Sequence, residues 1–300
     1  MKKLLRKLRR RPLDIELELA MRERESSFPY ISGDTFRTYC DVVVDETGVS
    51  TYDWVQGQFI FCATKYAGLL ATIAAETKNP SLTSSMTVLI HNGDTPPVKE
   101  VFEVLLAHFK SVYSVNATYE LEALGILPLP IGLENLHWNN NGVLKNYPLQ
   151  SDLMTFSNIL SRQNLILSSF NSRTNPKVRE PLQELVARSS IPITMIQGTN
   201  MVYVENLRNS IFVISPQGNG FDCHRTWEAF YSGAIPVVTE GTLSRSLTDQ
   251  LPILVVPTWN DFFKLNENEL RQEARRLSGR PRDSGYMPYW LSEFGIVIPD

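Results

Sequence analysis

The stretch SPQGNGFDCHRTWEAF, residues 215–230, lies between two short apolar runs, and this arrangement constrains the fold more than any other feature of the chain. The run before it, 211–214, and the run after it, 235–238, are each typical of a buried strand. Residues 226–232 have the composition of a helix, and Gly233 is a suitable C-terminal cap. The order strand, glycine loop, helix, strand predicts a right-handed crossover unit of a parallel β-sheet.

The predicted helix has an apolar and a polar face. Three aromatic residues spaced i, i+3 and i+4 form a stripe that we expect to pack on the sheet: Trp227, Phe230 and Tyr231. Arg225 and Glu228 share a different face, and we expect Asp222 to be the N-cap. The polar face therefore begins at a helix N-terminus, beyond the carboxyl end of a strand, where open α/β sheets bind ligands.

This helix start is suited to an anion. Free backbone N–H groups and the helix dipole favour negative charge, and the glycines at 218 and 220 allow a phosphate to approach the backbone. Arg225 adds donors for a diphosphate, and Glu228 can accept hydrogen bonds from a ribose. The same residues also fit a solvated helix start, with Asp222 as a simple cap and Arg225–Glu228 as a surface pair.

Two other chemistries do not fit this loop. The third glycine of a dinucleotide fingerprint would stand at Cys223, so the G-x-G-x-x-G pattern is incomplete. Cys223 and His224 are adjacent and lack the spacing of metal ligands.

The stretch resembles the C-terminal signature of the exostosin family of glycosyltransferases, roughly S-P-R-G-N-G-x-D-x-H-R-x-W-E-A-x-x-x-G-x-I-P-V-V. The matching residues are Ser215, Pro216, Gly218, Asn219, Gly220, Asp222, His224, Arg225, Trp227, Glu228, Ala229, Gly233 and 235–238. The chain departs from the signature at Gln217, where the family often has arginine. It is most similar to the compact, single-module exostosin-like enzymes of some bacteria and large algal viruses. The resemblance implies a GT-B fold, with two Rossmann-like domains facing a cleft, and inverting transfer from a nucleotide sugar.

The resemblance also implies which residues bind the donor. These are Arg173, Ser215, Gly218, Asn219, Gly220, Asp222, His224, Arg225 and Glu228. Arg173 follows the first predicted strand of the second half, in a loop that faces the donor phosphates in GT-B enzymes, and we expect Arg225 or Arg173 to compensate for Gln217. An exposed arginine without a ligand is the alternative.

An inverting transferase needs a carboxylate or an imidazole to take the proton of the acceptor hydroxyl. His91-Asn92-Gly93-Asp94 follows a predicted strand and resembles the family's H-N-[SG]-D element, so Asp94 is our first candidate for the base. The same residues also fit simple turn chemistry. His91 could orient a neighbour or act as the base itself.

Asp34, within the segment 32–37, is the rival base, and it also fits a structural helix cap. We expect Arg37 and Trp138 to contact the acceptor. Trp138 would stack on a sugar, although tryptophans more often pack in a core.

Apolar runs and helical patterns outline two α/β halves. Strands are predicted at 42–44, 59–63, 88–90, 112–114, 126–129, 165–167, 193–195, 211–214, 235–238 and 253–256, and helices at 68–77, 98–110, 151–161 and 270–277. We place an acceptor domain at 1–133, a nucleotide-sugar domain at 134–280, and a tail at 281–300 that crosses back. Residues 130–135, PIGLEN, resemble the motif at which family members pass from one domain to the other.

Composition limits the binding partners and the cellular compartment that we expect for the chain. The net charge of −3 argues against a general nucleic-acid binder, and three cysteines suggest a reducing compartment, so we expect a cytoplasmic protein, or one of the host cytoplasm if it is viral. Residues 1–11 carry seven Lys or Arg with no apolar segment after them, which predicts neither a signal peptide nor an anchor. This basic end could contact anionic membrane weakly, or be a solvated terminus.

These observations give a first functional hypothesis. No D-x-D triplet occurs, so we expect a metal-independent transferase with no cofactor, using a UDP-sugar donor and a glycan acceptor. UDP-xylose is the first guess, followed by UDP-glucuronic acid and UDP-galactose. The alternatives are an inactive nucleotide-sugar or glycan-binding module of the same fold, and a nucleotide-sugar epimerase or other Rossmann enzyme.

Overall fold

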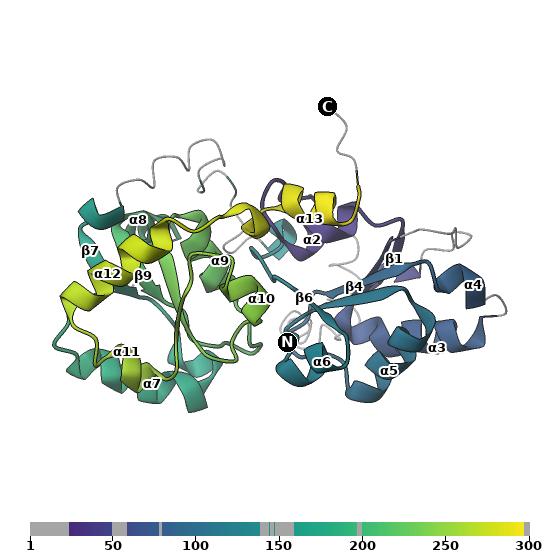
Figure 1. Ribbon diagram of the computed structural model, residues 1–300, viewed down its shortest axis with the longest axis horizontal. Coiled ribbons are helices and arrows are strands. Elements are labelled where there is room, and N and C mark those ends of the chain that lie inside the picture. The colour runs from purple at the N-terminus through teal and green to yellow at the C-terminus, as the bar shows by residue number, and fades with distance from the viewer. Residues whose placement is uncertain are drawn as a thin grey trace, which may run out of the picture.

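The computed structural model describes residues 24–49, 59–77, 80–138, 144, 147, 159–196 and 200–296. Within these residues, two β-sheets with their helices form two lobes that lie side by side (Figure 1). The prediction of an α/β chain with two Rossmann-like halves in a GT-B arrangement is confirmed.

The first sheet has six strands in the order β2-β1-β3-β4-β5-β6, of which only β2 pairs antiparallel with its neighbour. The strands are β1 (Val42–Asp45), β2 (Gly48–Val49), β3 (Phe59–Ala63), β4 (Thr87–His91), β5 (Ser111–Val115) and β6 (Leu127–Leu129). Its helices are α3 (Ala67–Glu76), α4 (Pro80–Thr83), α5 (Lys99–His108) and α6 (Tyr119–Ala123). The parallel strands follow one another in chain order, so right-handed crossovers bring their helices to one face.

Successive residues of β3 point to opposite faces of this sheet. Ile60 and Cys62 are buried in one core cluster with residues of α3 and α5. Phe61 lies in another cluster with Phe36 of α2 (Gly33–Thr38) and Trp290 of α13 (Met287–Glu293). The second face is therefore covered by helices near the two ends of the described chain.

The second sheet has five parallel strands in the order β11-β10-β9-β7-β8. They are β7 (Asn164–Ser168), β8 (Ile193–Met195), β9 (Ser210–Ile214), β10 (Ile235–Thr239) and β11 (Leu254–Val256). Helices α7 (Pro176–Arg188), α11 (Trp259–Phe262) and α12 (Glu267–Ser278) contribute to one core cluster. Helices α8 (Asn200–Asn209) and α9 (His224–Tyr231) contribute to the cluster on the other face.

The strand order of this sheet reverses between β7 and β9, as expected of a doubly wound sheet. Ligands of such sheets bind at this switch point, beyond the carboxyl ends of the strands. The loops after β7 and β9 are therefore brought together where the donor site is predicted.

The aromatic stripe of α9 lies in a core cluster with Val238 of β10, as predicted, and also reaches beyond the sheet. Ala229 of the same helix packs with Leu167 and Val213 of the sheet. Trp227, Phe230 and Tyr231 join a cluster that includes residues of both lobes. The Tyr231 hydroxyl accepts from the Ile31 N–H at 3.1 Å and donates to the Gly285 carbonyl at 2.8 Å. The stripe thus ties the second lobe to the first lobe and to the C-terminal tail.

The tail returns to the first lobe after α12. The Met287 N–H donates to the Pro29 carbonyl at 2.9 Å, and the Trp290 ring packs against Phe36 with ring centroids 6.1 Å apart. Figure 1 shows α13 beside α2. The remaining short elements are η1 (Thr64–Tyr66), η2 (Leu136–Trp138), η5 (Ser172–Thr174), α10 (Arg245–Thr248) and η6 (Asp283–Gly285).

All ten predicted strands are present, with ends shifted by no more than about two residues, which is usual for strand boundaries. The hairpin strand β2 was not predicted. The basic segment 1–11 and most of the helix predicted at 151–161 lie outside the described residues. In the part of the chain that the structure describes, no helix is long and apolar enough to cross a membrane.

Candidate functional site

Two cavities meet between the lobes. The small cavity has a volume of about 200 Å³ and lies against the loop after β9 and the start of α9. The large cavity has a volume of about 630 Å³ and is lined mainly by residues of the first lobe and of the segment that leaves it. Four residues line both cavities: Asp94, Ile131, Asn219 and His224. Any group that moves from one cavity to the other would therefore pass these four residues.

The loop after β9 forms one wall of the small cavity. Gly218, Asn219 and Gly220 line it, and the Gly218 N–H donates to the Gly220 carbonyl at 3.1 Å. A Cβ on Gly220 would stand 2.8 Å from the Asp94 carbonyl oxygen, so only glycine allows the two lobes to approach this closely. Ser215 is buried behind the loop, where its hydroxyl bonds the Thr226 hydroxyl at 2.8 Å.

Asp222 is not the N-cap of α9. The helix begins one residue later than predicted, with Cys223 in the cap position and without a side-chain cap. The buried Asp222 carboxylate accepts instead from the Ile131 N–H at 2.8 Å and from the Trp227 Nε1–H at 2.9 Å. Burial raises the pKa of Asp222 to about 7, and these N–H donors oppose the rise. Asp222 therefore joins the loop to the first lobe.

Glu228 and Arg225 are not a solvated surface pair. Glu228 is buried, lines the small cavity, and accepts from the Tyr203 hydroxyl at 2.7 Å. Burial raises the pKa of Glu228, and nearby Arg225 opposes that shift. Arg225 also lines the cavity, and its Nε is a buried donor without a hydrogen-bond partner among the described residues. A buried N–H of this kind normally has an acceptor, which a ligand can supply.

Arg179, and not the predicted Arg173, lines the small cavity. Arg173 is exposed on η5 and does not line the small cavity. Arg179, on α7, is buried and lines it. Its guanidinium donates to the carbonyls of Gln217 at 2.8 Å, Pro216 at 3.2 Å and Asn171 at 3.0 Å. Arg179 therefore holds the glycine loop in place and puts a positive charge next to it.

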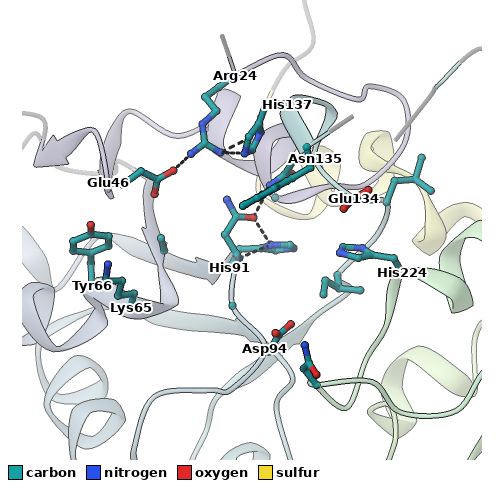
Figure 2. Close-up of a pocket in the computed structure, with 18 residues that line it drawn as sticks. Arg24, Glu46, Lys65, Tyr66, His91, Asp94, Glu134, Asn135, His137 and His224 are labelled. Carbon is teal, nitrogen blue, oxygen red and sulfur yellow. Dashed lines mark hydrogen bonds and ion pairs between the residues drawn. The ribbon is translucent and has the colours of Figure 1, made fainter. Parts of the chain in front are cut away.

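His224 lies at the junction of the two cavities. Its Nδ1 is 2.8 Å from the Gly132 carbonyl oxygen, which can only accept, so Nδ1 carries a proton. Figure 2 shows the imidazole directed into the cavity, opposite Tyr66. Gly132 has φ of 69° and its missing Cβ would meet the Ile31 carbonyl at 2.1 Å, which explains the glycine in PIGLEN.

Asp94 is the only carboxylate among the four junction residues. It follows β4 in the first lobe, is exposed, and lies at the lower end of the large cavity in Figure 2. The preceding Asn92 has φ of 55°, a left-handed conformation that Asn tolerates better than most residues. This turn directs Asp94 to the junction.

His91 has no nitrogen available for an acceptor hydroxyl. Its Nδ1 accepts from the Asn92 N–H at 2.8 Å, and its Nε2 lies 3.2 Å from the Pro130 carbonyl. Burial lowers the pKa of His91 to about 4, so the ring is neutral near pH 7. His91 holds the loop that carries Asp94.

Asp34 is buried and already has partners. The N-cap of α2 is Ser32, whose hydroxyl accepts from the Thr35 N–H at 3.1 Å, and the Asp34 carboxylate does not cap. Asp34 Oδ2 lies 2.8 Å from His137 Nδ1, and Asp34 Oδ1 lies 3.1 Å from Arg24 Nη1. Asp34 does not line either cavity, whereas His137 and Arg24 line the large one.

The two predicted acceptor residues have different positions. Trp138 lines the large cavity and is 47% exposed. Arg37 does not line it, because its Nε donates to Asp45 at 2.8 Å on the edge of the first sheet. Burial of Asp45 opposes ionisation, but the hydrogen bonds from Thr47 and Arg37 outweigh it and lower the pKa of Asp45.

Several cavity residues were not predicted. Arg179 shares the buried face of α7 with Leu182 and Val186, and an arginine on an apolar stripe is a signal that could have found it. Asn116 lines neither cavity but supports the loop by accepting from the Asp222 N–H at 2.8 Å, and no motif marks it. In the large cavity the missed residues are Arg24, Glu46, Lys65, Tyr66, Glu134, Asn135 and His137. Within the described ranges, no three His, Cys, Asp or Glu side chains form a group that could hold a metal ion.

Comparisons with known proteins find a weak likeness in structure and no match in sequence. No protein-family model matches the chain, and no curated protein matches its sequence. The structure is similar to an α,α-trehalose-phosphate synthase (UDP-forming) from Burkholderia vietnamiensis, with a TM-score of 0.39 and 10% sequence identity. That likeness covers 79% of this chain and 74% of the other. A likeness of this degree carries no argument about activity, so the exostosin resemblance rests on the quoted motifs alone.

Proposed function

We propose that this chain is a glycosyltransferase that moves a sugar from a nucleoside diphosphate sugar to a hydroxyl group of an acceptor, with inversion at the anomeric carbon. The observation that carries the proposal is the junction of the two cavities. A cavity bordered by arginines and a glycine loop meets a larger cavity, and the carboxylate of Asp94 lies where they join.

The small cavity is suited to the donor. Arg225 offers an unpartnered Nε–H, and Arg179 adds positive charge beneath the loop 218–220. Glu228, already bonded to Tyr203, has a second oxygen for ribose hydroxyls. His224 and Asn219 reach toward the transferred sugar, because they also line the large cavity. Arg173 has no place in this proposal, since its side chain is outside the cavity.

The reaction would be a single displacement. The acceptor oxygen forms a bond to the anomeric carbon while its proton passes to the Asp94 carboxylate. The bond from the anomeric carbon to the diphosphate oxygen breaks, and the diphosphate leaves with the electron pair. Arg225, Arg179 and backbone N–H groups of the loop stabilise that charge electrostatically, without a metal ion. Attack from the first lobe, opposite to the leaving group, gives inversion.

The first experiment is a thermal-shift screen of UDP- and GDP-sugars, with UDP-xylose tested first. A ligand at about 100 times its Kd stabilises the folded state by about 2.7 kcal/mol. A hit is then assayed for release of UDP, with and without acceptor. If UDP binds but no sugar nucleotide is ever cleaved, the chain is a binding module and the transferase proposal is wrong. Binding of NAD instead of UDP would favour a Rossmann-type epimerase.

A further inference from the structure

We propose that Asn116 is a positioning residue, which joins the loop that carries Asp94 to the glycine loop of the second lobe and so sets the distance between the base and the donor. This inference rests on the proposed function, in which Asp94 is the base. Asn116 lines neither cavity, and it touches no substrate. Its side-chain amide forms one hydrogen bond to a loop of each lobe.

The first sheet places Asn116 beside the loop of Asp94. Strands β4 and β5 are parallel neighbours, and Asn116 directly follows β5, whereas residues 92–94 follow β4. The two segments therefore leave the sheet at the same edge, where ligands of such sheets bind. The Asn116 Nδ2–H donates to the Gly93 carbonyl at 3.1 Å, and Gly93 is the residue before Asp94. The amide thus holds the base-carrying loop from the side.

The oxygen of the same amide reaches the second lobe. Asn116 Oδ1 accepts from the Asp222 N–H at 2.8 Å, just after the glycine loop. A Cβ on Gly220 would stand 2.9 Å from both polar atoms of the amide and 2.8 Å from the Asp94 carbonyl oxygen. One amide group therefore lies between the two loops, and the glycine at 220 allows both loops to close on it.

Asparagine suits this position for two physical reasons. The Gly93 carbonyl can only accept and the Asp222 N–H can only donate, so the bridging side chain must offer one donor and one acceptor. The φ angle of Asn116 is 56°, in the left-handed region where asparagine is enriched among residues other than glycine. The side chain is 4% exposed, so both hydrogen bonds are shielded from water.

The spacing of the two loops matters because the two lobes supply different parts of the proposed reaction. Asp94 comes from the first lobe, whereas Arg225 and the glycine loop, which would hold the diphosphate, come from the second. Misplacement of a reacting group by about 1 Å can lower a rate by about 100-fold. Loss of the bridge should therefore lower turnover, while the affinity for the nucleotide stays near the wild-type value.

Two variants of Asn116 test the bridge in different ways. Asn116→Gly removes both hydrogen bonds and accepts the positive φ without strain. Asn116→Asp keeps an oxygen for the Asp222 N–H but turns a second oxygen, in place of a donor, toward the Gly93 carbonyl. For both we expect kcat to fall by about 10- to 100-fold, measured as nucleotide release from the sugar nucleotide found in the thermal-shift screen. The Kd for UDP, from calorimetric titration, should not change.

Tyr119→Phe is the matched control, because it removes another hydrogen bond between the lobes. The Tyr119 hydroxyl on α6 accepts from Arg245 Nε on α10 at 3.2 Å, outside both cavities. This variant should keep the wild-type kcat. A folded Asn116→Gly that also keeps the wild-type kcat would overturn the inference, since a purely structural contact lowers stability alone. A rise in the Kd for UDP as large as the fall in kcat would overturn it too, because the bridge would then shape the donor site.

Hydrogen exchange separates this inference from the proposed function, because it needs no substrate. In Asn116→Gly the amide hydrogen of Asp222 should exchange about ten-fold faster than in wild type, as expected for a lost hydrogen bond. In Tyr119→Phe it should exchange as in wild type. Unchanged exchange in Asn116→Gly would show that no bridge is formed. If wild type neither binds nor cleaves a sugar nucleotide, the proposed function fails, and exchange alone decides whether Asn116 joins the lobes.

Discussion

The small cavity and the large cavity both lie beyond the carboxyl ends of central strands, yet the sequence builds them differently. The small cavity has Arg179 and Arg225 beside a glycine loop, and most of its lining comes from residues 218–228. The large cavity has three carboxylates and is assembled from segments around 24, 46, 65, 92 and 135. One site is local in sequence, whereas the other is dispersed along the chain.

This contrast has a mechanistic consequence. Under the proposed function, the donor diphosphate would bind in the second lobe and the acceptor in the first, so the two substrates would not compete for one site. Asp94 belongs to the first lobe but borders both cavities. Variants that affect one lobe and not the other therefore test the separation.

The largest effect on turnover is expected for Asp94, which borders both cavities. Asp94→Asn keeps the shape of the side chain but removes its basic oxygen. Turnover should fall by about 10²–10⁴, while affinity for the UDP-sugar stays near the wild-type value. Steady-state kinetics and nucleotide titration on the same preparation measure both quantities.

Asp34→Asn is the matched control for this variant. Its carboxylate is buried against Arg24 and His137, so the substitution should lower the free energy of unfolding by roughly 2 kcal/mol. Turnover of the folded fraction should remain. A fully folded, inactive Asp34→Asn beside an active Asp94→Asn would move the base to the Asp34–His137 pair.

The next effect concerns the free energy of unfolding at low pH, through His91 of the first lobe. The pKa of His91 is about 4 in the folded chain, against 6.5 for an unperturbed histidine, so the unfolded chain binds more protons between these values. Stability should therefore be lost as the pH falls from about 6.5 to about 4, by up to roughly 3 kcal/mol. His91→Asn should lack this loss.

Denaturant titrations of wild type and His91→Asn at several pH values measure the difference. The pKa of Asp222 is raised to about 7, so its contribution has the opposite sign and is lost as pH rises toward 7. Both chains share that contribution, and it cancels in the comparison. Parallel pH dependences for the two chains would contradict the buried, neutral state of His91.

A smaller effect, on the affinity for UDP, is expected for Arg225 in the second lobe. Arg225→Lys keeps the charge but loses the planar set of donors, and should weaken UDP binding by about ten-fold. Arg173→Lys, the same change at an exposed position, should leave UDP affinity unchanged. If the Arg173 variant were the weaker binder, the loop after β7 would have to carry the phosphate contact instead.

The sequence predicted the strands and the position of the glycine loop well because their signals are local. Apolar runs of three to five residues mark the central strands, and the glycine loop lies beside its helix in one stretch. The large cavity could not be predicted in the same way. Arg24, Asp34 and His137 meet across more than 100 residues of chain, and no spacing in the sequence reports such a contact.

The errors have a common physical cause. Asp222 was predicted to be a cap, and a surface pair and a cap were the alternatives for Glu228 and Asp34, yet each of the three is buried and bonded to a distant part of the chain. Burial of a polar group depends on tertiary partners, which periodicity does not reveal. Arg179 differs from these three residues, because its position on the apolar stripe of α7 can be seen in the periodicity of the sequence.

The smallest effect is expected from chelation. If Arg225 and Arg179 supply the positive charge for the leaving diphosphate, EDTA should leave the rate of transfer unchanged within error. The assay is initial-rate transfer with EDTA in excess, followed by addition of Mn²⁺ or Mg²⁺. A control enzyme known to need metal shows that the chelator is effective. Loss of transfer that returns with metal would mean that a cation, and not the small cavity's arginines alone, balances the charge of the diphosphate.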